Sequence, residues 1–87
     1  MAEIDVQAEK TESGYSCRVT VTEGRGKTEH SVTVKENDYT RLTQGEISPE
    51  VLVRESFRFL LERESKESIL RSFDLMTIGR YFPEYER

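Results

Sequence analysis

The single cysteine, Cys17, and the single histidine, His30, are the residues of this chain best suited to nucleophilic chemistry. A thiol activated by a neighbouring imidazole base is a recurrent catalytic pair. Each lies in a segment that alternates between apolar and polar residues with period two, and each occupies one of the apolar positions of its segment. There, a cysteine acts as a small buried hydrophobe, and a histidine near a strand end is partly exposed. The pattern favours structural roles, so we expect no catalytic residue here.

Carboxylates and one glycine-rich segment are the other features that could support chemistry. Glu50 and Glu62 stand four residues from Arg54 and Arg58, respectively, a spacing that supports a helix. The segment Gly24-Arg25-Gly26-Lys27-Thr28 resembles the end of a phosphate-binding loop but lacks the upstream spacing of that motif. Because it joins two predicted strands, we interpret it as a hairpin turn. We therefore expect no enzyme activity, no cofactor and no metal site.

Composition narrows the function classes further. The 87 residues carry 13 basic and 17 acidic side chains, and the net charge of −4 opposes a general affinity for nucleic acid or anionic membranes. One cysteine cannot form an internal disulfide, and Met1 to Asp5 lack the basic and apolar regions of a signal peptide. No apolar run approaches the roughly 20 residues that span a bilayer. We expect a cytoplasmic protein of a prokaryote.

The first 35 residues alternate between apolar and polar side chains with period two, which is typical of half-buried strands. Residues 11–14 and 23–27 supply turns between them. We predict a three-stranded antiparallel β-meander over residues 1–35. Its apolar positions are Ile4, Val6 and Ala8, then Tyr15, Cys17, Val19 and Val21, then His30, Val32 and Val34.

Residues 36–87 are predicted to be helical, which makes residues 1–87 one α+β domain. Asn37 or Asp38 caps a short turn closed by Gly45. Ser48 is a good N-cap, and Pro49 suits the first position of a long helix that reaches about residue 64. The apolar stripe of that helix, Val53, Phe57, Leu60 and Leu61, should cover the apolar face of the sheet.

Two shorter helices are expected after the long helix. Ser65 could cap one that contains Ile69, Leu70 and Phe73. Asp74 could cap another, which Pro83 ends.

Residues 30–64 resemble a ribbon-helix-helix protein, with a strand, a short helix and a longer helix opened by Ser48. The resemblance implies that the strand pairs across a dimer and that Ser31, Thr33 and Lys35 read the major groove. The first helix is several residues shorter than that family needs, and two preceding strands compete for the same edge.

Residues 67–82 are similar to a helix-turn-helix, with Arg80 on the second helix. The turn region is about two residues shorter than usual. Both resemblances imply a transcriptional regulator as the alternative function. Its candidate nucleic-acid contacts are Arg18, Arg25, Lys27, Lys35, Arg71 and Arg80.

Protein interaction is the preferred interpretation. Edge strands of a meander carry unpaired backbone groups that pair with partners unless something blocks them. The third strand, over 28–35, or the first, over 3–8, could join its copy. Tyr and Phe are frequent at interface centres, and they gather late in this chain. We predict a non-enzymatic homodimer or subunit of an assembly. The candidate interface residues are Val32, Val34, Tyr81, Phe82 and Tyr85.

Overall fold

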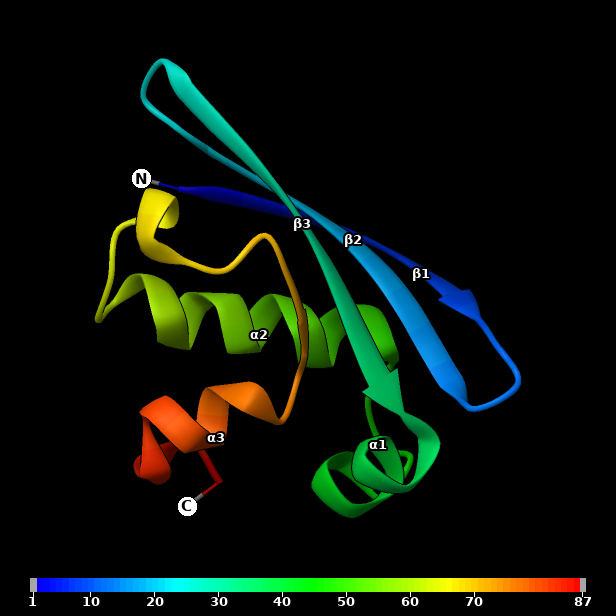
Figure 1. The fold of residues 1–87 in the computed structure, drawn as a ribbon. Helices are drawn as coiled ribbons and strands as arrows, with labels where there is room; N and C mark the ends of the chain where they lie inside the picture. Colours follow the sequence, from blue (N-terminus) through cyan, green and yellow to red (C-terminus); the bar gives the residue numbers. More distant parts are fainter. Residues whose placement is uncertain (1, 87) are drawn as a thin grey trace.

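Period-two alternation builds three long strands in a computed structural model that describes residues 2–86. They are β1 (Glu3–Lys10), β2 (Gly14–Glu23) and β3 (Gly26–Lys35), and they form the predicted antiparallel meander (Figure 1). Val19 in β2 pairs with Val6 in β1 and with His30 in β3. Successive side chains point to opposite faces, so one face of the sheet is apolar and the other is polar.

A fourth strand, β4 (Ser72–Asp74), pairs in parallel with β3 and makes the sheet mixed, in the order β1-β2-β3-β4. The prediction of a helix after Ser65 is therefore wrong. Only a short 3-10 turn, η1 (Lys66–Ser68), forms before the chain extends. The four-residue spacing of Ile69 and Phe73 fits a strand as well as a helix, so periodicity could not decide between them.

The backbone of β3 explains why the extended form is favoured. The N–H of Ser31 donates to the carbonyl of Arg71 at 2.7 Å, and the N–H of Leu75 donates to the carbonyl of Thr33 at 2.8 Å. These bonds satisfy groups of β3 that would otherwise lie unpaired at a sheet edge. The free edge expected on the third strand is thus occupied over residues 31–33.

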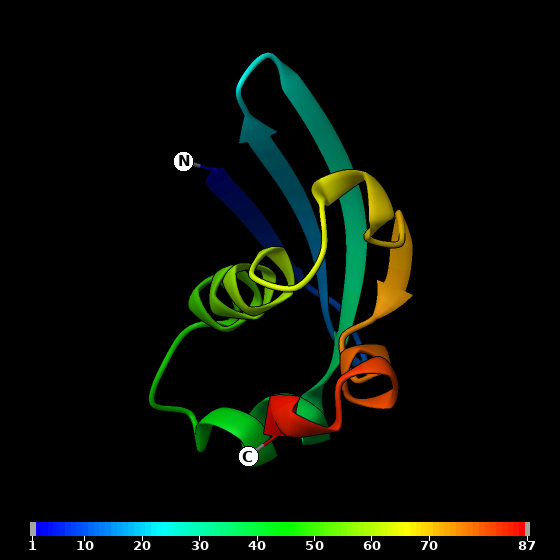
Figure 2. The same ribbon diagram turned by 90° about the vertical axis from the view of Figure 1, so that its left-hand side faces the viewer.

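The long helix, α2 (Pro49–Leu61), lies against the apolar face of the sheet (Figures 1 and 2). The hydroxyl of Ser48 accepts a hydrogen bond from the N–H of Val51 at 3.2 Å, as expected for its N-cap. Val53 and Phe57 are fully buried on the side of α2 that meets the sheet. The helix ends at Leu61, slightly before the expected residue 64.

The shorter helices differ from the prediction in their ends. α1 (Glu36–Thr43) follows β3 directly with Lys35 as N-cap, so neither Asn37 nor Asp38 caps it. Gln44, with φ 55°, is the C-cap in the left-handed conformation, and Gly45, with φ 75°, follows it in the same region and closes the turn as expected.

The last helix, α3 (Thr77–Tyr81), precedes a 3-10 turn, η2 (Pro83–Glu86). The carboxylate of Asp74 accepts from the N–H of Met76 at 3.0 Å, ahead of the helix start. None of the helices within residues 2–86 has the length and apolar content that crossing a bilayer requires.

Candidate functional site

Cys17 and His30 lie on the same buried face, and both ring nitrogens of His30 bond to groups other than the Cys17 thiol. Cys17 pairs with Val32, and His30 pairs with Val19, so the two residues are diagonal neighbours. His30 is only 2% exposed, in contrast to the partial exposure expected. Its Nδ1 lies 2.7 Å from the carbonyl oxygen of Leu70, and its Nε2 lies 2.9 Å from Oγ1 of Thr28.

Hydrogen-bond chemistry fixes the tautomer of His30. A carbonyl oxygen only accepts, so Nδ1 carries the proton and Nε2 accepts from the Thr28 hydroxyl. Burial lowers the pKa of His30 below its ordinary 6.5, and the nearby Arg71 charge lowers it further, against the bond to Leu70. Neither ring nitrogen is available as a base, so neutral His30 serves as an anchor for Leu70.

Cys17 is expected to be unreactive in the folded chain. Burial, together with the charge of Glu50, raises the pKa of its thiol from 9.0 to about 11. At pH 8 this lowers the thiolate fraction about 100-fold relative to the unfolded chain, before any steric protection. We expect iodoacetamide to modify native Cys17 at least about 100-fold more slowly than the urea-unfolded protein. Similar rates in the two states would contradict this buried, protonated thiol.

The cavity best suited to binding is an apolar groove of about 200 Å³ beside the C-terminal end of α2. Its walls come from α2, from the segment that enters β4, and from α3. Leu70 and Tyr81 border the groove and remain 48% and 67% exposed. The other apolar residues of the groove are Leu60, Ile69, Phe73, Ile78 and Phe82.

Aromatic contacts hold two of the groove walls. Phe73 packs on Phe57, with ring centroids 6.1 Å apart, and Phe57 packs on His30 at 5.2 Å. On the other side Phe82 meets the ring of Phe59 edge-on at 5.9 Å. The groove is therefore attached to the core and is not a gap between loose segments.

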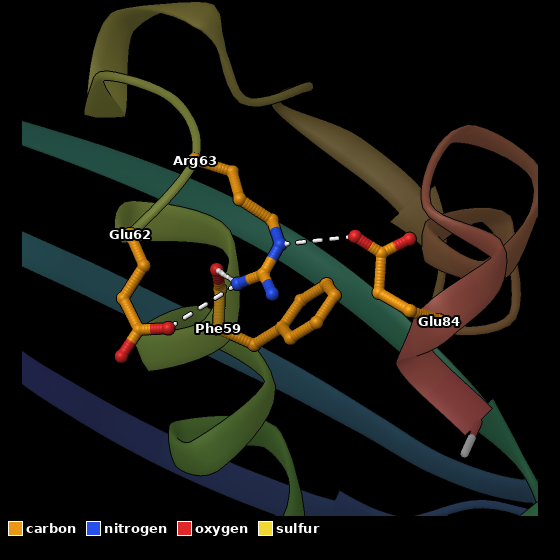
Figure 3. Close-up of polar contacts among 4 residues, drawn as sticks. All are labelled: Phe59, Glu62, Arg63 and Glu84. Carbon is orange, nitrogen blue, oxygen red and sulfur yellow. Dashed lines mark hydrogen bonds and ion pairs between the residues drawn. The ribbon is translucent and has the colours of Figure 1, made fainter.

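Arg63 fastens the C-terminal turn to α2 (Figure 3). Its guanidinium lies 3.7 Å from the centroid of the Phe59 ring and donates to the Phe59 carbonyl at 2.9 Å. Its Nε contacts the carboxylate of Glu84 at 3.4 Å, and its Nη1 contacts that of Glu62 at 3.2 Å. The clamp keeps η2, and with it Phe82, against the helix.

The predicted interface residues have different places in the structure. Val32 and Val34 are buried in the core. Phe82 and Tyr85 are half-buried and pack on Phe59, and Tyr81 alone is largely exposed. The structure therefore separates the expected aromatic patch into two half-buried residues that pack against Phe59 and one surface residue.

The groove also contains residues that the sequence analysis did not select. Leu70 is the clearest example. In an extended segment, neighbouring side chains point to opposite sides, so Leu70 faces solvent when Ile69 faces the core, although Leu70 is apolar. An apolar residue at a solvent-facing position indicates an exposed contact surface, but only when the segment is known to be extended.

The six basic candidates do not form one surface. Arg18 lies in the middle of the polar sheet face, whereas Lys27 and Lys35 lie near opposite ends of β3, about 26 Å apart along the strand. Arg25 lies in the turn between β2 and β3, Arg71 precedes β4, and Arg80 lies on α3. The side chains on the polar face include no aromatic ring on which a base could stack.

The two DNA-binding resemblances also lose their structural basis. β3 lies between β2 and β4, so residues 31–33 are not available to pair with a second copy. The first part of the segment 67–82, which a helix-turn-helix needs as a helix, contains the extended strand β4. Nucleic-acid binding itself stays an untested prediction.

Among the side chains that the structure describes, within residues 2–85, no three of His, Cys, Asp or Glu lie close enough together to hold a metal ion. Searches against protein-family models, curated proteins and solved structures gave no match. The site is therefore interpreted from its own geometry.

Proposed function

We propose that this chain is a non-catalytic interaction module that self-associates as a homodimer through the apolar groove and its border residues, Leu70 and Tyr81. The observation that carries the proposal is the combination of a built apolar groove with two large, exposed apolar side chains beside it. Exposed apolar surface that adjoins a pocket is typical of an interaction site. The proposal retains the cytoplasmic location expected from the sequence.

The charges near the groove favour a second copy as the occupant. Glu64 and Glu67 precede the apolar segment, whereas Arg71 and Arg80 adjoin Leu70 and Tyr81. A surface that carries both positive and negative charges can be complementary to a second copy of itself across a two-fold axis. A stable interface needs about 800 Å² from each partner, or roughly a seventh of the 5747 Å² surface of this chain.

Truncating the groove border should dissociate the dimer. We expect Tyr81→Ser and Leu70→Ser each to raise the dimer dissociation constant at least about tenfold, or about 1.4 kcal/mol, because each removes an apolar contact at the interface centre. Analytical ultracentrifugation across a concentration series measures the constant.

Ile47→Ser is the matched control for these two variants. Ile47 is a large apolar residue, 40% exposed, and it precedes the opposite end of α2. Its substitution should leave the dissociation constant unchanged. If Ile47→Ser weakens the dimer as much as the groove variants do, the interface lies elsewhere.

A further inference from the structure

The outer edge of β1 is the second surface that the fold leaves without a partner. β1 and β4 lie at opposite edges of the sheet (Figure 2), and among residues 2–86 no strand pairs with the outer side of β1. All eight residues of β1 pair with β2 in continuous register, so the strand contains no bulge, and it contains no proline. Bulges, prolines, covering segments and charged side chains are the usual features that protect an edge, and of these β1 has the charged side chains.

The register shows which backbone groups of β1 face outward. The N–H of Thr11 donates to the carbonyl of Gly14 at 2.8 Å, which makes residues 11 and 14 a hydrogen-bonded pair. Such pairs alternate along antiparallel strands, so Glu3, Asp5, Gln7 and Glu9 direct their backbone groups toward β2. The N–H and C=O groups of Ile4, Val6 and Ala8 therefore point to the open edge.

The side chains of β1 divide the edge into one apolar and one acidic side. Ile4 and Ala8 are half-buried on the face that α2 covers. Glu3, Asp5 and Glu9 are exposed on the polar face, and none of the three carboxylates has an ion pair with another described residue. The residues directly opposite them on β2 are the uncharged Thr22, Thr20 and Ser16, and Arg18, opposite Gln7, is a diagonal neighbour of Asp5 and Glu9.

These charges oppose pairing of β1 with its own copy. Antiparallel self-pairing that keeps the apolar faces together has three central registers. In the first register Glu3 lies opposite Glu9 of the other copy, in the second Asp5 lies opposite Asp5, and in the third Asp5 lies opposite Glu9. Like charges directly opposite each other destabilise a strand pair. A strand with basic side chains at those positions would instead meet opposite charges.

We propose that the β1 edge binds an extended segment of a different protein in which apolar residues alternate with lysine or arginine. The segment adds a strand to the sheet, and the outward backbone groups of Ile4, Val6 and Ala8 bond to its backbone. Its apolar residues continue the face that Ile4 and Ala8 begin, and its basic residues contact Glu3, Asp5 and Glu9.

The test measures binding of a labelled seven-residue peptide of alternating lysine and valine by fluorescence polarisation. Peptides with glutamate in place of lysine, or with the lysines grouped at one end, serve as controls. We expect the alternating lysine peptide to bind at least about tenfold more tightly than either control, with affinity that falls as salt rises. Equal binding of the three peptides would overturn the proposal.

Charge reversal on the protein localises the binding. Asp5→Lys combined with Glu9→Lys should weaken the lysine peptide at least about tenfold and strengthen the glutamate peptide. Glu29→Lys, on the same polar face but in β3, should change neither by more than about twofold. An equal loss in Glu29→Lys would overturn the proposal, because it would show a general charge effect.

Ala8→Pro tests the backbone contribution, because it removes an outward N–H and keeps the bonds to β2. It should abolish peptide binding without changing the solution mass; if it fails to fold, the charge variants still decide. A lower mass would assign the edge to a second copy and overturn the proposal. Tyr81→Ser should bind the peptide normally, so failure of the proposed dimer and failure of this edge are separate results.

Discussion

Replacement of Gly14 by alanine is expected to lower the free energy of unfolding by about 3 kcal/mol. A Cβ at this position would lie 2.0 Å from the carbonyl oxygen of Val34 and 2.7 Å from the nitrogen of Glu36. Both are backbone atoms where β3 turns into α1, so no side chain can move aside to make room. Stabilities of about 4 to 13 kcal/mol are usual for a domain of this length, so the loss is severe. Urea unfolding followed by circular dichroism measures it.

Gly24→Ala separates this clash from the effect of backbone conformation. Gly24 has φ +62°, yet a Cβ added there would meet nothing within 4 Å. We expect Gly24→Ala to cost only about 1 kcal/mol, the penalty of a left-handed alanine. Equal costs for the two variants would contradict the close approach of the β1–β2 turn to the start of α1.

Replacement of His30 by alanine is expected to cost about 2 to 3 kcal/mol. The substitution leaves the Leu70 carbonyl and the Thr28 hydroxyl without their partner, and it opens a cavity beside Phe57. Ser31→Ala is the matched control, because the Ser31 side chain is exposed and its backbone bond to Arg71 remains. The control should stay within about 0.5 kcal/mol of the parent chain in the same unfolding assay.

The pH dependence of stability isolates the charge state of His30. Its pKa is lowered in the folded chain, so below pH 6.5 the unfolded chain binds the proton more readily than the folded chain. The contribution of neutral His30 to the free energy of unfolding is therefore complete above pH 6.5, and it is lost as the pH falls through the pKa of His30 in the folded chain. His30 is the only histidine, so His30→Ala should remove most of the change in urea midpoint between pH 7.5 and 5.5. Equal changes in parent and variant would contradict a neutral, buried His30.

The strands and the long helix were predictable because their signals are local. Alternation assigned the inward residues of β1, β2 and β3, and Ser48 with Pro49 located the start of α2. β4 was not predictable by the same means, since the spacing of Ile69 and Phe73 fits two periods. The choice depends on bonds to β3 from a segment about 40 residues away.

The candidate site was harder to predict than the fold for the same reason. Tyr81 is exposed, whereas Phe82 and Tyr85 are held by Phe59, a contact between α2 and the C-terminal segment that no local pattern encodes. Leu70 borders the groove because His30 binds its carbonyl across 40 residues of sequence. Similarly, Gly14 is required because backbone atoms where β3 joins α1 leave no room for a Cβ, whereas the sequence indicated only a turn at this position.

The two proposed surfaces differ in charge and therefore in partner. The groove near α3 has both acidic and basic residues close by, which suits a second copy, whereas the β1 edge is acidic, which suits a basic strand. A dimer formed through the groove would leave both β1 edges open. Each assembled pair would then present two equivalent docking edges.

The solution mass of the unmodified chain, measured by light scattering across a concentration series, tests the proposed self-association most directly. The proposal predicts a mass near twice the chain's 10.2 kDa at high concentration, falling toward one chain on dilution. A mass of one chain at every concentration would contradict the homodimer.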